Sequence, residues 1–500
     1  MTRWGMVIDL EKCVGCDTCS AACSQMNHVP SGAGWRQVIP LDTPKLGNPQ
    51  NGRLFLPTNC MHCGDAPCQT VCPTTATFRH ADGIVDIHDE LCIGCGYCVV
   101  ACPYLARTIT RYDEVYAFTP ELLPAATDRS GICTKCDFCL PRVEAGLVQG
   151  LTPGIDAAAS PNCVNFCIAD AIHFGDLHDP DSNISRMIQA KPTMRLQEDL
   201  GTDPAIQYVM RADYPGMNGA AVELVPPRKQ KVWHKPAAFN FILGGTGAAV
   251  YLLGLWLDWL GAPVTDWYKL LAPVLIGLGL LGLTLEAGRP FRSVHIFRGW
   301  RHSWMSREAW AAAFFLPLAA AAWLWPDSLL DWLAALAALA FLISQSFIVY
   351  RSRAVTAWNR PIILWVMVAA SFVSGAGLFL LAAALFHQAV ISYLAAAGLV
   401  SVLAQGGLWL VYLHGSGDKA FDLGTAVLRK PRSLLATMGL GVVVPLILLA
   451  GMLLVDLPAL LLGVTAVISG GAMLLGSAGL KAQLILQAGY LRGIQAGPVR

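Results

Sequence analysis

All seventeen cysteines of this 500-residue chain lie between Cys13 and Cys167, whereas nearly every long apolar run lies after residue 238. Charged residues make up only 14% of the chain, compared with about 25% in ordinary soluble domains. The net charge of +1 gives no basic excess for binding nucleic acid. The sequence therefore predicts two domains, a cysteine-rich soluble domain over residues 1–232 and a membrane domain over residues 233–500.

Sixteen of the cysteines fall into four groups of four with short, regular spacings. The first and third groups have the spacing C-x2-C-x2-C-x3-C, and Pro103 follows the third. The second group widens one gap to C-x2-C-x4-C-x3-C, and the fourth consists of two separated pairs. In sequence order the groups are Cys13, Cys16, Cys19 and Cys23; Cys60, Cys63, Cys68 and Cys72; Cys92, Cys95, Cys98 and Cys102; and Cys136, Cys139, Cys163 and Cys167. Cys133 is left over.

The spacing C-x2-C-x2-C-x3-C-P is the bacterial ferredoxin signature of a [4Fe–4S] cluster. Gly15, Gly94 and Gly96 allow the backbone to turn around a cluster, so that N–H groups can point at its sulfurs. Zinc is the alternative, but zinc sites usually combine two CxxC pairs. Disulfide frameworks are typical of small secreted domains. The pattern predicts an α+β ferredoxin-like domain that holds four [4Fe–4S] clusters.

Longer motifs around these cysteines resemble the four-cluster electron-transfer subunits of molybdopterin oxidoreductases, the dimethyl sulfoxide reductase, polysulfide reductase and formate dehydrogenase group. They include Asn59-Cys60-Met61-His62-Cys63, Ala101-Cys102-Pro103-Tyr104 and Lys135-Cys136, and the resemblance covers most of residues 1–180. It implies that the first and fourth groups share two clusters and that the second and third share the other two. The implied ligand sets are Cys13, Cys16 and Cys19 with Cys167; Cys136, Cys139 and Cys163 with Cys23; Cys60, Cys63 and Cys68 with Cys102; and Cys92, Cys95 and Cys98 with Cys72.

The second half of the chain contains eight apolar segments, each close to the length of about twenty residues that a membrane-spanning helix needs. Very short connections join several of them, as at Trp325-Pro326-Asp327. We therefore expect an all-α polytopic domain of eight transmembrane helices with both ends on the same side. The predicted spans are Phe239–Leu260, Leu270–Glu286, Trp310–Trp325, Leu329–Tyr350, Ile362–Phe386, Val390–His414, Leu434–Leu454 and Leu457–Leu480.

Positive charge is distributed unevenly between the two ends of these segments. Eighteen lysine and arginine residues flank them on the side of the N-terminal domain, and Lys269 alone lies on the opposite side. Under the positive-inside rule, the N-terminal domain faces the cytoplasm. No secretory signal fits before Cys13, which gives the same expectation. The predicted location is a bacterial cytoplasmic membrane, crossed several times.

The connection after the second apolar segment resembles that of the dimethyl sulfoxide reductase membrane anchor, with Gly288-Arg289-Pro290 near its start and Ser306-Arg307-Glu308 at its end. The resemblance implies a quinone site, and Glu286 stands where the family often has a quinol-interacting histidine. We expect Glu286 and Glu308 to transfer protons. The expected quinone-binding residues are Arg289, Arg292, His295, His302 and Arg307. The alternative is a basic interfacial loop that orients the helices and docks the soluble domain.

The two halves together resemble a fusion of an iron–sulfur subunit and a membrane anchor. The resemblance implies a chain that passes electrons between a separate molybdopterin-containing catalytic subunit and the membrane quinone pool, most simply from sulfite to quinone. One alternative is a quinol-driven reductase of dimethyl sulfoxide, polysulfide or another S- or N-oxide. Another is a redox-linked ion transporter, which the lack of midplane charges beyond Lys481 disfavours. No haem is expected, because the histidines of the membrane half lie at helix ends or in loops.

Overall fold

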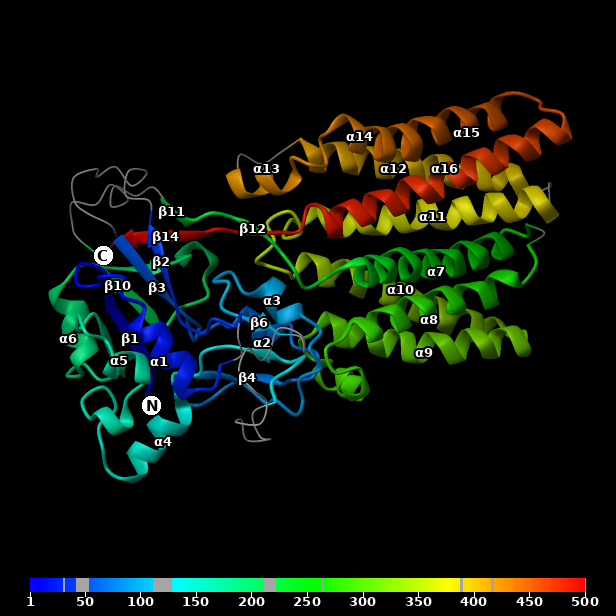
Figure 1. The fold of residues 1–500 in the computed structure, drawn as a ribbon. Coiled ribbons are helices and arrows are strands. Elements are labelled where there is room, and N and C mark those ends of the chain that lie inside the picture. Colours follow the sequence, from blue (N-terminus) through cyan, green and yellow to red (C-terminus); the bar gives the residue numbers. More distant parts are fainter. Residues whose placement is uncertain are drawn as a thin grey trace. The chain divides into compact units, whose positions relative to one another are not determined.

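The computed structural model describes residues 1–29, 32–41, 54–110, 128–210, 222–262, 264–386, 390–414 and 418–499 (Figure 1). The chain forms two compact units. The first, here called the cysteine unit, comprises Met1–Arg228 and Leu491–Arg500, and the second, the helical unit, comprises Lys229–Tyr490. The sequence boundary at residue 232 leaves the segment after residue 490 with the membrane half. The structure assigns it to the cysteine unit because it adds a strand to that unit's sheet.

A six-stranded mixed sheet organises the cysteine unit. Its strand order is β11-β14-β9-β10-β1-β8. In that order the strands span Val222–Val225, Ile494–Val499, Thr193–Leu196, Ile206–Val209, Trp4–Asp9 and Ile172–Asp176. β1 is buried along its whole length and pairs in parallel with β10, whereas its pairing with β8 is antiparallel. β14 lies between β11 and β9, with Ala496 opposite both Val222 and Leu196.

The cysteine groups lie on loops and short helices around two-stranded sheets. These sheets are β2 (Gln37–Leu41) with β3 (Leu54–Thr58), β4 (Thr77–Arg79) with β5 (Val85–Ile87), and β6 (Thr108–Ile109) with β7 (Cys133–Thr134). A further two-stranded sheet, β12 (Arg228–Lys229) with β13 (Tyr490–Leu491), contains no cysteine. The helices are α1 (Thr18–Met26), α2 (Pro67–Thr70), α3 (Tyr97–Ala101), α4 (Leu140–Val148), α5 (Asn162–Asn165) and α6 (Asn183–Ala190), with short 3-10 turns at Ala157–Ala159 and Glu198–Leu200. Each cysteine group therefore leads into a helix of at most nine residues.

The loops that precede these helices use left-handed backbone conformations. Gly15 has a φ of 72°, and a Cβ there would meet the ring of Phe55 at 2.4 Å, so that only glycine fits. Gly96, at the start of α3, has a φ of 75°. The equivalent positions before α1 and α4 are Asp17 and Cys139, also left-handed. The expectation that glycines let the backbone turn around the cysteines is confirmed.

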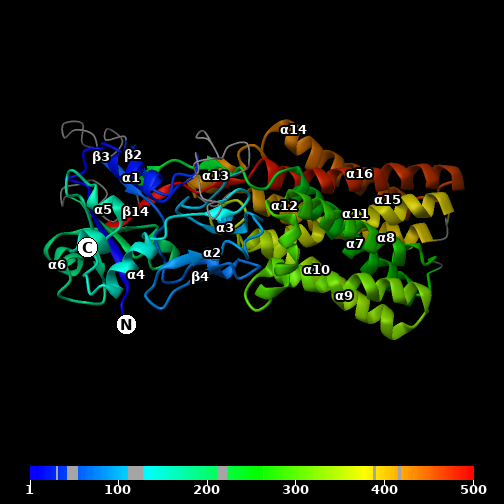
Figure 2. The same cartoon turned by 60° about the horizontal axis from the view of Figure 1, so that its bottom comes forward.

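The helical unit consists of long helices that lie alongside one another in both views (Figures 1 and 2). Glycines bring several helices into close contact, since a Cβ on Gly476 would lie 2.1 Å from the Cα of Gly441. The elements are α7 (Lys235–Trp259), α8 (Trp267–Glu286), the 3-10 helix η8 (Pro290–Gly299), α9 (Trp304–Leu324), α10 (Ser328–Tyr350), α11 (Ile362–Phe386), α12 (Ile391–Leu413), α13 (Lys419–Thr425), α14 (Pro431–Leu434), the π-helix η10 (Leu435–Val443), α15 (Val444–Leu454) and α16 (Ala459–Leu486).

Within the described residues, seven helical spans are long and apolar enough to cross a membrane, and one of them is formed by α14, η10 and α15 together. The expectation of eight was wrong. The exception is α9. This helix begins six residues before the predicted span, so that it includes Arg307 and Glu308, and alanine and tryptophan supply much of the remainder. These residues contribute less apolar character than the leucine, isoleucine and valine of the other helices. The seven long apolar helices identify a multi-pass membrane protein.

The single lysine on the sparsely charged side of the helical unit is neutralised inside the protein. Lys269 of α8 is 3% exposed, and its Nζ lies 2.9 Å from an oxygen of Asp331 on α10. The hydroxyl of Tyr251 donates to the same carboxylate at 3.4 Å. Because this lysine is paired, the exposed positive charge of the helical unit is even more one-sided than the sequence count indicates.

Candidate functional site

The structure gathers the sixteen cysteines of the four groups into four sets. Set 1 contains Cys13, Cys16, Cys19 and Cys167; set 2 contains Cys23, Cys136, Cys139 and Cys163; set 3 contains Cys60, Cys63, Cys68 and Cys102; and set 4 contains Cys72, Cys92, Cys95 and Cys98. These are the sets that the family resemblance implies. They differ in exposure, because Cys16 is exposed whereas every member of set 3 is buried.

Mutual electrostatic effects show that the members of sets 3 and 4 are neighbours. Burial raises the pKa of Cys63, and the thiolates of Cys60, Cys68 and Cys102 raise it further. In set 4, burial raises the pKa of Cys95, and the other three members act in the same direction. A cavity is lined by all four cysteines of set 4, together with the glycines of the Cys92–Cys98 loop.

The same relation holds in the sets that join the first and fourth groups. Burial raises the pKa of Cys13, and Cys167 and Cys16 add to the effect. In set 2, burial together with Cys163 and Cys139 raises the pKa of Cys23 to about 12. Thiols with such raised pKa values stay protonated at neutral pH, so a metal that binds them must displace their protons.

Hydrogen-bond donors surround the sulfurs, as a bound iron–sulfur cluster requires. The backbone N–H of Thr77 donates to Cys72 at 3.4 Å, and that of Ala171 donates to Cys167 at 3.2 Å. Set 2 receives the most side-chain donors: the amides of Asn27, Asn59 and Asn162 reach its sulfurs at 3.4–3.9 Å. Within the described residues, no three His, Cys, Asp or Glu side chains lie close enough to hold one metal ion. The residues present fit larger, all-thiolate groups such as [4Fe–4S] cubanes.

Cys133, the cysteine outside the four groups, is buried against set 4. It lines the same cavity, and its backbone N–H donates to the sulfur of Cys92 at 3.4 Å. The hydrogen bond from its thiol, aided by the charge of Arg107, outweighs burial and lowers the pKa of Cys98 to about 6. Cys133 therefore acts as a donor beside this set, a role that its spacing alone did not indicate.

Polar and aromatic contacts connect the sets in a row. The amide of Asn59 donates to the carbonyl of Cys60, next to set 3, and to the sulfur of Cys136 in set 2. Nearby, the ring of His62 stacks on Phe138 with the ring centroids 3.7 Å apart. Cys163 of set 2 raises the pKa of Cys19 in set 1, and Cys98 of set 4 raises the pKa of Cys68 in set 3, both by charge repulsion. The order of neighbours is thus set 1, set 2, set 3, set 4.

In the helical unit, the residues expected around a quinone separate into different environments. Glu286, at the end of α8, accepts from the backbone N–H of His234 at 2.8 Å and lies 3.1 Å from its Nδ1. Glu308 is 1% exposed inside the bundle and accepts from the amide of Asn240 at 3.2 Å. In these contacts the two glutamates have different partners, His234 for Glu286 and Asn240 for Glu308. Arg289, Arg292 and His295 lie on or just before η8, and His302 is exposed.

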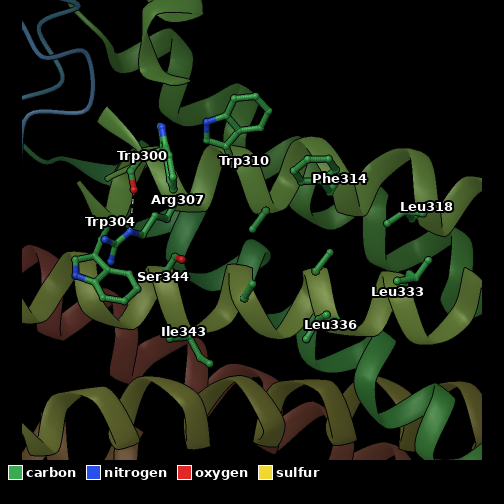
Figure 3. Close-up of a pocket in the computed structure, with 13 residues that line it drawn as sticks. Trp300, Trp304, Arg307, Trp310, Phe314, Leu318, Leu333, Leu336, Ile343 and Ser344 are labelled. Atoms are coloured by element: carbon green, nitrogen blue, oxygen red, sulfur yellow. Dashed lines mark hydrogen bonds between the residues drawn. The ribbon is translucent and has the colours of Figure 1, made fainter. Parts of the chain in front are cut away.

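Arg307 lines an apolar groove of about 830 Å³ between α9 and α10. Its guanidinium lies 4.3 Å from the ring centroid of Trp304 and donates to the carbonyl of Trp300 at 3.0 Å. Figure 3 shows Arg307 and the tryptophans toward one end of the groove, and Leu318 and Leu333 toward the other. The groove therefore combines a long apolar wall with hydrogen-bonding groups at one end, which is the usual composition of a small-molecule site.

A buried polar chain in the helical unit was not found by sequence reasoning. The amide of Gln345 donates to the carbonyl of Asn240 at 3.1 Å, which connects α10 to the residue that binds Glu308. Lys481 is 1% exposed and donates to Ser371 at 2.8 Å. A Cβ on Gly245 would lie within 3.3 Å of both Lys481 Nζ and Gln345 Oε1, so these two polar atoms face one small space. The signals in the sequence were single polar residues in apolar helices, namely Asn240, Gln345 and Lys481.

Comparison with known proteins places the cysteine unit among iron–sulfur subunits. The 4Fe-4S dicluster domain family matches residues 52–117. The putative iron-sulfur subunit of the dimethyl sulfoxide reductase of Halobacterium salinarum is 41% identical over 233 residues, which cover 43% of this chain and 82% of that protein. One component of the polysulfide reductase of Wolinella succinogenes is 34% identical, covering 41% of this chain and 94% of that protein. The iron-sulfur cluster-binding subunit of the menaquinone reductase of Nitratidesulfovibrio vulgaris is also 34% identical, with 42% and 90% covered.

Proposed function

The chain belongs, through its cysteine unit, to the iron–sulfur electron-transfer subunits of the dimethyl sulfoxide reductase family, and we propose that it passes electrons between a molybdopterin-containing catalytic subunit and the membrane quinone pool. The observation that carries this proposal is one chain with four cysteine sets in a row and seven apolar helices. In the proposal each set holds one [4Fe–4S] cluster. The clusters supply one-electron transfer, and this chain's residues set their order, burial and hydrogen bonds.

The groove between α9 and α10 is the proposed quinone site. Phe314 and Leu318 offer an apolar surface for the quinone, while Arg307 and Ser344 offer donors for its oxygens. Glu308, adjacent to Arg307 in sequence, contacts the buried polar chain and is the proposed proton-transfer residue. Glu286 is the second proposed proton-transfer residue, because one of its oxygens is buried without a hydrogen-bond partner among the described residues. Arg289, Arg292, His295 and His302 remain proposed members of the site's basic rim.

The proposed orientation places the cysteine unit on the cytoplasmic side. The support is the excess of lysine and arginine at that end of the helices, and the pairing of Lys269 with Asp331 removes the one opposing charge. β11 precedes the helical unit, β14 follows it, and the two strands pair in one sheet. In this proposal both ends of the helical unit lie on the same side of the membrane as the cysteine unit.

Sulfite is the proposed electron donor, because the group that this sequence resembles includes a sulfite-oxidising complex on the cytoplasmic side. That is the side proposed for the cysteine unit. A reductase of an S- or N-oxide is the second candidate, and the names of the dimethyl sulfoxide and polysulfide reductase relatives favour it. The two are distinguished in the purified complex by the direction of electron flow. Sulfite should reduce oxidised clusters under the first proposal, whereas dimethyl sulfoxide or polysulfide should oxidise reduced clusters under the second.

Filling the groove tests the quinone proposal. Ala340 lines the groove, whereas its neighbour Leu339 is exposed and does not line it. In the full-length protein, Ala340→Trp should slow cluster reduction by a short-chain quinol at least tenfold, and Leu339→Trp should leave the rate unchanged. Dithionite should reduce the clusters equally in both variants. Equal quinol rates in the wild type and Ala340→Trp would place the quinone elsewhere.

A further inference from the structure

Two arginines are buried in the cysteine unit among the cysteine sets. Arg36 and Arg107 are each 3% exposed, and within the part of the chain that the structure describes their hydrogen bonds go to amide, hydroxyl and sulfur atoms and not to carboxylates. Burying an arginine without a counter-charge is costly, since an isolated buried cation loses its hydration. The cysteine sulfurs around both side chains would supply the missing negative charge once they bind metal as thiolates. This suggests a common role for two residues that are 71 positions apart in the sequence.

Arg36 lies between sets 1 and 2. One terminal nitrogen donates to the sulfur of Cys163 in set 2 at 3.3 Å, and the other donates to Asn59 Oδ1 at 3.0 Å. Asn59 in turn donates to the sulfur of Cys136 at 3.4 Å. Cys19 of set 1 and Cys163 of set 2 are among the strongest charge neighbours of this guanidinium. One cation therefore acts on two sets, directly and through one amide.

Arg107 has the corresponding position between sets 3 and 4. It donates to Thr77 Oγ1 at 3.0 Å, and the backbone N–H of Thr77 donates to the sulfur of Cys72 in set 4 at 3.4 Å. The same guanidinium nitrogen donates to Cys133 at 3.7 Å. Its strongest charge neighbours are Cys68 of set 3 and Cys98 of set 4. Again, one cation acts on two sets and reaches a sulfur through one polar residue.

Both guanidinium groups also have N–H donors that make no hydrogen bond among the described residues. Among the described residues, Arg36 Nε has no hydrogen-bond partner, and neither Nε nor one terminal nitrogen of Arg107 has one, although all three atoms are buried. Unpaired buried donors are rare and require an explanation. The sulfur atoms of clusters held by the adjacent sets would provide acceptors for them.

We propose that Arg36 and Arg107 are tuning residues, each of which raises the reduction potentials of one pair of clusters: Arg36 those of sets 1 and 2, and Arg107 those of sets 3 and 4. A thiolate-ligated cubane carries net negative charge that grows when it takes up an electron. A fixed cation in a buried site stabilises the reduced form more than the oxidised form. This inference rests on the proposal that the four sets bind clusters. It adds that each arginine acts on the clusters of two neighbouring sets.

The experiment is a redox titration of the full-length protein, with each cluster followed by its electron paramagnetic resonance signal. Arg36→Gln should lower the potentials of the set 1 and set 2 clusters and leave the other two unchanged, and Arg107→Gln should do the opposite. We expect at least a tenfold fall in the equilibrium constant for one-electron reduction, which corresponds to about 59 mV. Signals are assigned with variants that remove one ligand from each set. Arg186→Gln is the matched control, because it removes the same charge from an exposed side chain.

Iron analysis separates the tuning role from ligation. Low iron in the wild-type protein would refute the four-cluster proposal, whereas full iron in Arg36→Gln or Arg107→Gln with unchanged potentials would refute tuning. If either glutamine variant shifts the reduction potentials of all four clusters, the division into pairs is refuted. Where a glutamine variant fails to load iron, Arg36→Lys and Arg107→Lys keep the charge and should retain potentials close to those of the wild type. If a lysine variant binds the full amount of iron and its equilibrium constant for cluster reduction still falls tenfold, the role of charge is overturned.

Discussion

The most deeply buried basic side chains of the cysteine unit and of the helical unit have different partners. In the helical unit, Lys269 is paired with Asp331, and Lys481 donates to Ser371 and to a backbone carbonyl. In the cysteine unit, Arg36 and Arg107 face sulfurs instead of carboxylates. Metal-bound thiolates would therefore balance these two arginines, whereas Lys269 is balanced by a carboxylate of the helical unit itself. We expect cofactor loading to stabilise one unit and to leave the other nearly unaffected.

Removing the iron should have the largest effect. Oxidative chelation should expose the cysteine unit to proteases, because sixteen thiols and two guanidinium groups lose the groups that balance them. The helical unit should keep its helices and its resistance. Limited proteolysis with mass spectrometry, combined with circular dichroism in detergent, measures both. The control is chelator without oxidant, and equal cleavage of the two units would contradict the contrast.

Loss of one ligand should have the next largest effect. Wild-type protein should contain about sixteen iron atoms, as expected for four [4Fe–4S] clusters, and Cys136→Ser should contain about twelve. Cys133→Ser should retain the full content, because Cys133 lies outside the four sets and only donates to set 4. Iron and sulfide analysis of anaerobically purified protein measures this. Loss of iron from Cys133→Ser but not from Cys139→Ser would make the assignment of set 2 wrong.

Breaking the buried ion pair should destabilise the helical unit alone. Lys269→Met leaves the Asp331 carboxylate buried without its cation, which typically costs about 3–5 kcal/mol. Arg429→Gln breaks the more exposed pair with Asp422 and should cost about 0–1 kcal/mol. Detergent unfolding curves give the difference, and iron content should stay constant in both variants. A loss of iron in Lys269→Met would mean that the two units are not independent.

The smallest effect concerns quinone turnover. Glu308→Gln keeps the shape of the side chain but removes an acceptor of protons, and a tenfold slower rate would correspond to about 1.4 kcal/mol in the barrier. Glu286→Gln keeps an oxygen that can accept from His234 and should have a smaller effect. Cluster content should remain that of the wild type in both. Wild-type quinone rates in the two variants would leave this region as an orienting and docking element only.

Local features of the sequence predicted the cysteine unit well, because cluster motifs are compact. The spacing from Cys13 to Cys23 and the glycine at Gly15 indicated both the [4Fe–4S] motif and its turns. No local pattern marks Arg36 and Arg107, because their contacts are distant in sequence. Arg36 contacts the sulfur of Cys163, more than a hundred residues away, and Arg107 contacts Thr77.

Hydropathy predicted the helical unit less accurately than spacing predicted the cysteine unit. The predicted span Trp310–Trp325 was the wrong one. The segment is helical, but α9 starts at Trp304 instead of Trp310 and so includes charged residues, and its alanines are less apolar than leucine or isoleucine. The separation of Glu286 from Glu308 depends on helix packing, and no spacing in the sequence encodes it. The same is true of the groove beside Arg307.

The position of β14 between β11 and β9 has a consequence for how the protein is made. Its residues, Ile494–Val499, are translated only after all of residues 229–490, so the neighbouring strands wait for a partner while the helices enter the membrane. Pairing across such a long stretch of chain is slow to form. Until it forms, β9 and β11 each present an unpaired edge. A chain that stops within the helices would therefore keep its sheet open between β9 and β11.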